Sequence, residues 1–343
     1  GEKVDTLVLD VGVNIARQER GMSLELSNRE ETLEIELRQV AATEEYEYVL
    51  PVIFHVLYRV PEDDIPVGYL SSCLERVNEL YRDGPVDMNL KFVLATHDPN
   101  GQLLEEPGVR REFREGLPMD MFDFVGNKFG DCAWIWDPKE YINVVIFDSK
   151  SIPSGCAHFP YLPESVVLPG VLFSDWYADH LPDAHVHCVA WNRSHMFSRY
   201  ELLGVIFDYD VFTLAHEMGH YLGLLHPFVD GKGDFGDYCD DTPDYCVNGY
   251  ETFLSELDET FPYSDDNYRK VIQRVALNGR VFIADNIMDY EFGYLDRFTL
   301  EQRKRVRTVL ENAWLLPGPK IEVEPWARSG KKAVKPSVPK PVS

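Results

Sequence analysis

The sequence lacks any apolar run that approaches the roughly 20 residues needed to cross a bilayer. Its first ten residues, GEKVDTLVLD, contain neither the basic segment nor the apolar core of a secretory signal. We therefore expect no transmembrane segment in this chain, and we expect that a signal sequence, if the protein is exported, has been removed.

Basic residues are scarce. The chain has 33 Lys and Arg against 58 Asp and Glu residues, which gives a formal net charge of −25. Such a surface repels nucleic acid and anionic lipid and attracts cations such as calcium, so no nucleic-acid partner is expected. The chain is 45% hydrophobic and 13% aromatic, which argues against disorder and suffices for one large core or two modest ones.

Cysteine is infrequent, and none of the six residues forms a CxxC pair, which argues against a zinc ribbon or a thioredoxin-type site. An even number of cysteines in an acidic chain suits disulfides in a secreted or extracytoplasmic protein. Cys239 and Cys246 are the most plausible local pair. The alternative is that the cysteines are buried free thiols.

Composition divides the chain into three parts. Residues 1–48 are rich in charge and contain two alternating segments, 6–15 and 32–40, that predict short strands in an appendage or pro-segment. Residues 49–316 carry the strongest signals of folded structure. Residues 317–343 are rich in Pro and Lys, which predicts an extended tail.

The central part alternates strand patterns with an amphipathic helix. The helix is predicted within 63–84 and is closed by Gly84. Runs of β-branched and aromatic residues predict buried strands at 48–60, 90–96, 141–147 and 166–173. This order indicates an α+β or α/β fold around one sheet.

The stretch TLAHEMGHYLGLLHPF, residues 213–228, places charged and metal-binding side chains in an apolar run. On a helix, His216 and His220 lie on one face, four residues apart, with Glu217 beside them. His226 can join them only if the helix ends, and Gly223 is placed to end it because glycine accepts the left-handed conformation. The alternative is a buried helix whose histidines are satisfied by hydrogen bonds.

Three neutral imidazoles leave one position of a tetrahedral zinc ion open for water, which is typical of a catalytic site. Zinc lowers the pKa of that water toward about 7, and a neighbouring carboxylate can take the proton as the water attacks a carbonyl. Glu217 is predicted to act in this way and to pass the proton to the leaving amine.

The motif HExxHxxGxxH, followed by NIMDY at residues 286–290, resembles the metzincin zinc peptidases. The resemblance implies that Met288 forms the Met-turn beneath the metal and that Tyr290 stabilises the tetrahedral intermediate. Within that group, LPVIFHVLYRV, LERVNELYRD, CAHFPY and GDYCDDTPDY resemble segments of the pappalysin family, peptidase family M43, over roughly residues 48–312.

The pappalysin resemblance implies an α+β metzincin-like fold in two lobes with a cleft between them. The upper lobe, to about residue 226, would hold a twisted mixed sheet and the active-site helix. The lower lobe, residues 227–316, would be irregular and end in a C-terminal helix. We therefore expect a zinc-dependent endopeptidase that cleaves proteins or peptides. The alternative is a non-catalytic extracellular binding or adhesion module that keeps the scaffold with a structural zinc ion.

The loop GDYCDDTPDY gathers hard oxygen atoms within a few residues, a pattern that suits calcium, although an acidic solvated turn explains it equally well. Pappalysin-like enzymes bind calcium in this loop. The resemblance thus implies ligands from Asp237, Thr242 and the Cys239 carbonyl, with Asp241 as a further candidate.

Two departures from the family pattern concern specificity and latency. The family's pocket Asp, five residues after the Met-turn methionine, is replaced here by Gly293, which weakens the basis for expecting cleavage before Arg or Lys. The alternative is that Glu291 or Asp296 substitutes for it. Since no cysteine precedes Cys73, a cysteine switch cannot operate from residues 1–72.

Three other histidines lie outside the motif. His55 lies in an apolar strand and is expected to be a satisfied core residue. His185 and His187 share one face of any strand in DAHVHC, which raises the possibility of a second metal ion. A surface loop is the preferred interpretation, because no third ligand stands at a suitable spacing.

Overall fold

The computed structural model describes residues 22–25, 32–35, 46–197, 199–202, 205–229, 236–255, 265–290 and 292–320. The chain divides into two compact units, Gly1–Tyr46 and Glu47–Ser343. In the first unit, β1 (Met22–Glu25) pairs antiparallel with β2 (Thr32–Ile35). The second unit holds the elements from β3 to α6.

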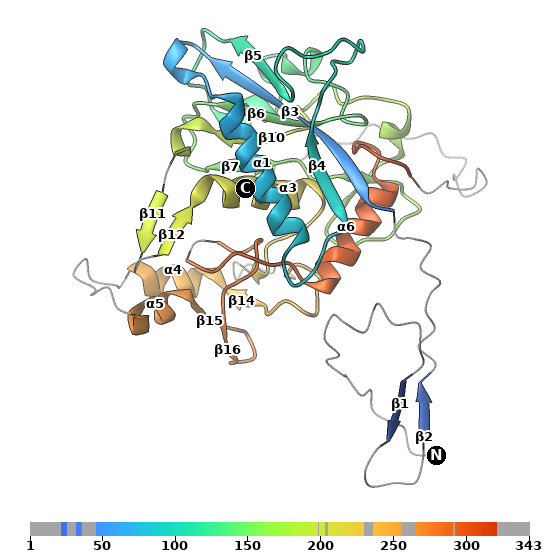
Figure 1. The fold of residues 1–343 in the computed structure, drawn as a ribbon, viewed down its shortest axis with the longest axis vertical. Coiled ribbons are helices and arrows are strands. Elements are labelled where there is room, and N and C mark those ends of the chain that lie inside the picture. Colours follow the sequence, from blue (N-terminus) through green and yellow to red (C-terminus); the bar gives the residue numbers. More distant parts are fainter. Residues whose placement is uncertain are drawn as a thin grey trace. The chain divides into compact units, whose positions relative to one another are not determined.

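The second unit is built on a six-stranded mixed sheet in the order β4-β3-β6-β10-β7, with β5 also paired to β3 (Figure 1). All pairs along this sheet are parallel except that of β7 with β10. The strands are β3 (Tyr48–Tyr58), β4 (Leu90–Leu94), β5 (Val109–Phe113), β6 (Ile142–Phe147), β7 (Gly155–Ala157) and β10 (Val189–Asn192).

The central strand β3 is buried on both faces because its side chains alternate between two cores. Leu50, Val52 and Phe54 face the larger core, which α1 (Val67–Arg82), α3 (Tyr209–Tyr221) and α6 (Leu300–Asn312) share. Leu57 faces the second core, beside α2 (Met121–Val125). The alternation therefore fixes which face of the sheet carries the long helices.

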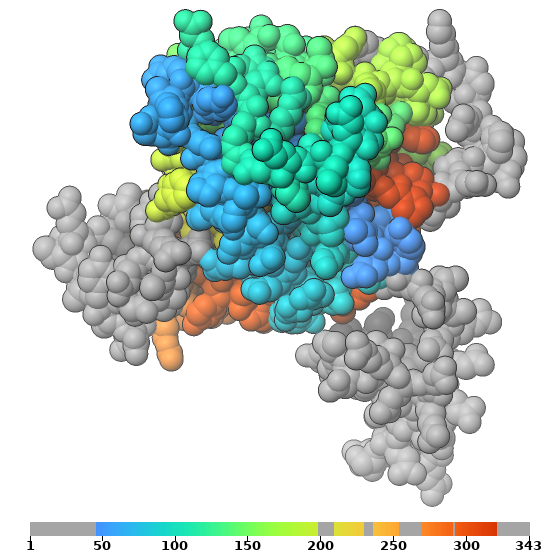
Figure 2. All heavy atoms as spheres, turned by 45° about the horizontal axis from the view of Figure 1, so that its top comes forward, coloured from blue at the N-terminus to red at the C-terminus, as the bar shows by residue number. Residues whose placement is uncertain are grey.

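The helix α3, which carries the histidine motif, lies between α1 and the edge of the sheet. It contacts α1 on one side and both β7 and β10 on the other (Figure 1). Figure 2 shows that blue and teal segments, the colours of α1 and of the connection from β4 toward β5, lie in the centre of the face drawn there. Every residue of α3 from Thr213 to Tyr221 is buried. The helix that carries the histidine motif is thus enclosed by α1 and by the β7 and β10 edge of the main sheet.

The segments after α3 are short. Two-stranded pairs replace the sheet, in accord with the irregular lobe predicted for this part. The elements are β13 (Phe228–Val229), β14 (Tyr245–Cys246), α4 (Val247–Ser255), α5 (Asp265–Ile272), β15 (Gln273–Val275) and β16 (Val281–Ile283). The remaining short pairs, before α3, are β8 (Tyr161–Leu162) with β9 (Leu172–Phe173), and β11 (Arg199–Leu202) with β12 (Val205–Asp208).

Most of the predicted central elements are confirmed, but the strand at 166–173 is wrong over most of its length. Only Leu172–Phe173 is a strand there, because Gly170 adopts a left-handed φ of 75° directly after Pro169. The predicted strand at 6–15 and the tail beyond residue 320 lie outside the described residues. None of the described helices is both long and apolar enough to span a membrane.

The cysteines and two of the histidines differ from expectation. All six cysteines are free thiols, so the predicted disulfides are absent from this structure. The thiol of Cys239 is directed at the carbonyl of Asp237, 3.6 Å away, while Cys246 belongs to β14. His185 and His187 are each 1% exposed, so the surface-loop interpretation is wrong. His55 is fully buried, as expected of a core residue, and its Nε2 lies 2.9 Å from Oδ1 of Asn143, but its Nδ1 makes no hydrogen bond, so it is satisfied at one nitrogen only.

Candidate active site

The reversal of the chain after α3 is the first requirement of the site. Gly223 has a φ of 88°, a left-handed conformation that ends the helix. Its amide donates to the carbonyl of His220 at 2.9 Å, and the amide of Leu224 donates to the carbonyl of Gly219 at 2.9 Å. This pair of bonds is a Schellman motif, which satisfies the last helical carbonyls while turning His226 back toward the helix.

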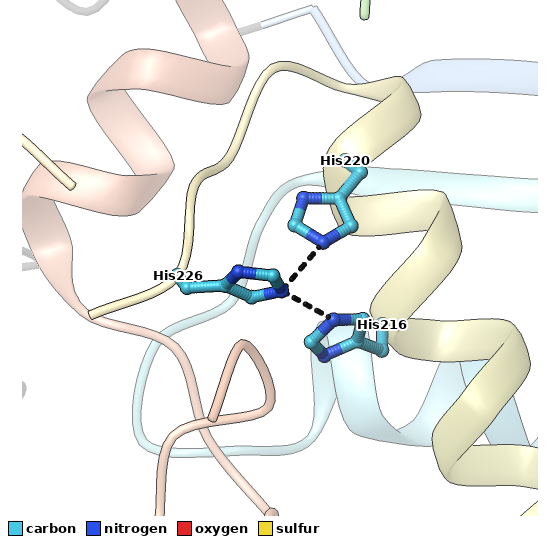
Figure 3. A group of neighbouring side chains, drawn as sticks. All are labelled: His216, His220 and His226. Atoms are coloured by element: carbon cyan, nitrogen blue, oxygen red, sulfur yellow. Dashed lines mark hydrogen bonds between the residues drawn. The ribbon is translucent and has the colours of Figure 1, made fainter. Parts of the chain in front are cut away.

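The three motif histidines converge on one point (Figure 3). Nε2 of His226 lies 3.1 Å from Nε2 of His216 and 3.0 Å from Nε2 of His220. A tetrahedral zinc ion with bonds of about 2.05 Å holds its nitrogen ligands about 3.3 Å apart, close to these values. The three nitrogen atoms therefore fit a single ion.

The other ring nitrogens hold two of these imidazoles in place. Nδ1 of His216 bonds to the carbonyl of Ile287 at 3.0 Å, and Nδ1 of His220 bonds to the carbonyl of Leu224 at 2.8 Å. Such bonds fix the ring orientation and leave Nε2 as the ligand atom. Burial lowers the pKa of all three histidines, that of His216 to about 4. The imidazoles are therefore neutral, which is the form that binds a metal ion.

Glu217 lies beside the histidines and is 3% exposed. Its Oε2 makes no hydrogen bond, and burial raises the pKa of the carboxyl group well above its ordinary value. Gly155 of β7 leaves room for the Glu217 side chain because glycine has no β-carbon. A β-carbon on Gly155 of β7 would lie 2.7 Å from Cγ of Glu217. Sequence reasoning missed Gly155, because only the pairing of β7 with β10 brings it against α3.

Met288 is fully buried, and its sulfur lies against Gly219 of α3. Its amide donates to the side chain of Asn286 at 2.9 Å. Asn286 and Gln302 in turn exchange two amide hydrogen bonds of 2.8 and 3.0 Å. Gln302 also completes a capping box with Thr299 at the start of α6. The turn that carries Met288 is thus fastened to the C-terminal helix by Asn286, the first residue of NIMDY, and by Gln302, which the motif did not reveal.

The ring of Tyr290 lies beside the histidines, with its centroid 4.7 Å from that of His226 and 6.0 Å from that of His216. Burial, with a smaller effect from the charge of Glu217, raises the pKa of its phenol to about 12. The side chain remains 38% exposed, so it reaches solvent as well as the histidines. At neutral pH it is a protonated hydrogen-bond donor at the edge of the site.

The acidic loop brings three of its four candidate calcium ligands together. Thr242 Oγ1 lies 2.7 Å from Asp237 Oδ1 and 2.8 Å from the carbonyl of Cys239. Oδ2 of Asp237 is buried without a hydrogen bond, and burial raises the pKa of this carboxyl group to about 6. An unbonded buried carboxylate oxygen among other oxygens suits a cation. The carboxylate of Asp241 instead accepts from the amide of Glu301 in α6, at 3.0 Å.

Gly293, where the family pattern has an acidic pocket residue, is packed against backbone. A β-carbon at this position would lie 2.6 Å from the carbonyl oxygen of Ala284. The backbone on either side of Gly293 is also constrained. Phe292 has a φ of 57°, and the amide of Tyr294 donates to the same Ala284 carbonyl at 2.8 Å. In this backbone the position accepts glycine only.

Comparisons with known proteins agree with this geometry. The peptidase M43 family model, described as pregnancy-associated plasma protein-A, matches residues 131–311. An extracellular metalloprotease of Verticillium alfalfae is 26% identical over 241 residues, which cover 64% of this chain and 70% of that protein.

Solved structures with the same fold include mature mirolysin of Tannerella forsythia in complex with a cleaved peptide. It is 20% identical, with a TM-score of 0.50, and the match covers 76% of this chain and 90% of that one. Mirolysin in complex with a compound is 20% identical, with a TM-score of 0.52, and the match covers 77% and 91%. These matches confirm the predicted α+β, metzincin-like fold.

Proposed function

Since this chain belongs to the peptidase M43 family of metallopeptidases, we propose that it is a zinc-dependent endopeptidase in which Glu217 assists the attack of water on a peptide bond. The observation that carries the proposal is the convergence of three neutral imidazoles beside a buried carboxyl group. His216, His220 and His226 would hold the ion. Zinc, when bound, would supply a Lewis acid that polarises the carbonyl and acidifies water.

The remaining chemistry belongs to the residues around the ion. Glu217 has an unbonded oxygen and would take the proton of the attacking water and deliver it to the leaving amine. Tyr290 would donate a hydrogen bond to the oxygen that gains negative charge. Met288 would support the histidines from below without contacting the substrate. Each role requires only the positions described above.

The substrates we propose are proteins or peptides, and we propose a secreted or extracytoplasmic setting. One relative is named an extracellular metalloprotease, and one structural neighbour was solved with a cleaved peptide. We further propose that calcium stabilises the loop through Asp237, Thr242 and the Cys239 carbonyl, because the Thr242 hydroxyl lies within hydrogen-bond distance of both other groups.

The decisive experiment is cleavage of a mixed peptide library by the wild type and by Glu217→Gln, with and without a zinc chelator. The wild type should yield chelator-sensitive products whose ends report the cleavage preference. Glu217→Gln should retain the ion and lose at least about 1,000-fold in activity, because the proton acceptor is gone. Glu75→Gln, an exposed glutamate of α1, is the matched control and should cleave normally.

Two results would contradict the proposal. Normal cleavage by Glu217→Gln would remove Glu217 from the proposed role. If the wild type binds zinc but yields no chelator-sensitive product, the alternative is favoured, namely a non-catalytic module with a structural zinc ion.

A further inference from the structure

A second group of three histidines is buried outside the site described above. His158, His185 and His187 are 0%, 1% and 1% exposed. Their ring centroids are separated by 4.6 Å (His158 to His185), 5.8 Å (His158 to His187) and 5.7 Å (His185 to His187). We refer to these three residues as the second histidine cluster.

The fold supplies the third member of the cluster. His158 follows β7, while His185 and His187 precede β10, and these two strands pair antiparallel. The amide of His158 donates to the carbonyl of Cys188 at 3.2 Å, which fixes the two segments side by side. The sequence offered no third ligand near DAHVHC because the third ligand comes from the neighbouring strand.

The imidazole nitrogens of the second histidine cluster are buried without hydrogen bonds. This holds for both ring nitrogens of all three residues. The backbone of Leu315 lies close enough to His187 to raise its pKa slightly, but not in hydrogen-bond geometry. Each unsatisfied buried polar atom costs about 1–3 kcal/mol. Six such atoms in one place can be satisfied by a partner from outside the protein chain.

The imidazoles are in the form that binds metal ions. Burial lowers the pKa of His185 to about 4, and it lowers the pKa values of His158 and His187 well below their ordinary value. All three rings are therefore neutral near neutral pH, with a lone pair free for an ion. A purely nitrogen donor set of imidazoles suits zinc and its neighbours among the transition metals rather than calcium or magnesium.

The spacing of the rings also suits a metal ion. Three imidazoles on a tetrahedral zinc have ring centroids about 5.2 Å apart, from a bond length of about 2.05 Å. The second histidine cluster spans 4.6 to 5.8 Å, and the rings of His216, His220 and His226 span 4.5 to 5.1 Å.

Ligation requires one rearrangement. Within the described part of the chain, only the His216 group already brings three ligand atoms within 4.8 Å of one another. Rings of the second histidine cluster must therefore turn about the Cβ–Cγ bond. Such a turn exchanges ring nitrogen and carbon positions and leaves the centroid nearly in place.

A small cavity adjoins the cluster. Its volume is about 30 Å³, and its lining includes His185, His187 and Cys132. That volume is enough for a water molecule as a fourth ligand. The thiol of Cys132 donates to the carbonyl of His185 at 3.0 Å, and burial raises its pKa to about 11, so without an ion it is a neutral thiol.

We propose that His158, His185 and His187 form a second, structural metal site that binds one zinc ion or a similar transition-metal ion. The site would join β7 to the segment before β10 behind the active-site helix. The ring of His187 lies 5.1 Å from that of Tyr221 at the end of α3. Phe159, next to His158, lies 5.8 Å from His220. An ion here would hold β7, and with it Gly155, against Glu217.

The test is the zinc content per chain after gel filtration in zinc-containing buffer, measured by elemental analysis. The wild type should carry two equivalents. The active-site variant His216→Ala/His220→Ala should carry one, the cluster variant His185→Phe should carry one, and their combination none. His97→Phe, which removes an exposed histidine, is the matched control and should keep two. Phenylalanine preserves the ring that packs against Tyr161 and Tyr177.

Cobalt provides a second readout. The active-site variant loaded with Co²⁺ should show the visible absorption of a four-coordinate nitrogen site, and His185→Phe in that background should abolish it. If His185→Phe does not fold, as judged by circular dichroism, the wild type and the active-site variant decide alone. Two equivalents against one support the proposal, and one against none overturns it.

Zinc retained by the combined variant would also overturn the proposal, because the second ion would then lie elsewhere. The outcome does not depend on peptidase activity. A protein that binds two zinc ions but cleaves nothing would refute the proposed function and leave the second site intact.

Discussion

The sulfur of Met288 occupies the space that a side chain at Gly219 would need. A β-carbon on Gly219 would overlap that sulfur. Gly219 stands directly before His220 on α3, so the close approach of the turn at Met288 to this helix depends on a position that the HExxH pattern leaves variable. The HExxH pattern specifies the candidate ligands, whereas Gly219 sets how closely the turn at Met288 can approach them.

Gly219→Ala should therefore weaken the metal site. We expect about 1–3 kcal/mol lower stability from overpacking and about 10- to 100-fold lower zinc affinity, because the residues that orient the ligands are displaced. Competition with a chelator and thermal unfolding measure the two effects. Gly68→Ala, in an open and exposed part of α1, is the control and should not lower stability. Wild-type zinc affinity in Gly219→Ala would show that the contact is unimportant.

Tyr290→Phe should reduce kcat by about 100-fold or more while changing KM little, because the hydroxyl would act on the transition state only. Steady-state kinetics on one peptide from the library measure both values. The phenol pKa of about 12 keeps the donor protonated in neutral assays. Tyr46→Phe, at an exposed tyrosine, serves as the control. A change in KM alone would assign Tyr290 to substrate binding.

Gly293→Asp should destabilise the protein rather than create a pocket for basic side chains. The new β-carbon would meet the Ala284 carbonyl, so the segment must move, at a cost of about 1–3 kcal/mol. Denaturant unfolding gives the cost, and product ends from the peptide library give the specificity. A stable variant that gains cleavage before Arg or Lys would mean that this backbone adapts.

His55→Phe should make stability less sensitive to acid. Burial lowers the pKa of His55 from 6.5 to about 3, so between these values the unfolded chain binds a proton that the folded chain does not. The stabilising contribution is complete above pH 6.5 and is lost as the pH falls toward 3. From pH 7 to pH 5 the wild type should lose about 2 kcal/mol more than the variant.

Denaturant unfolding of both proteins at the two pH values measures this difference, and loss of zinc at low pH affects both alike. Asn143 Oδ1 keeps a partner in His55→Phe, because the amide of Trp136 donates to it at 3.1 Å. Identical pH dependence of the two proteins would show that His55 does not titrate as burial predicts.

The sequence predicted the parts of this protein whose chemistry is local. The strand at β3, the helix α1 and the chain reversal at Gly223 all follow from patterns within a few residues. The mixed α+β fold followed from the motif and the resemblance it carried. The position of His226 could be predicted from the helix and one glycine. Helix geometry places His216 and His220 on one face, and the Schellman motif at Gly223 turns the chain so that His226 approaches them.

Features that depend on pairing between distant segments were not predictable. Gly155 meets Glu217, and His158 meets His185, only because β7 pairs with β10. Neither contact has a spacing in the sequence. The disulfide prediction failed for a similar reason. An even number of cysteines and an acidic composition do not tell which thiols lie close together in the fold. The assigned roles of the site residues and the calcium loop stay predictions until they are measured.

The guanidinium of Arg305 in α6 donates to the carbonyl of Gly223 at 2.6 Å and to that of Pro169 at 2.6 Å. The turn that brings His226 to the other histidines is therefore clamped by a residue 79 positions later than His226 in the chain. During synthesis, the complete histidine motif leaves the ribosome well before its clamp does. A nascent chain, or a fragment that stops short of α6, carries every ligand of the motif without the part that holds them together.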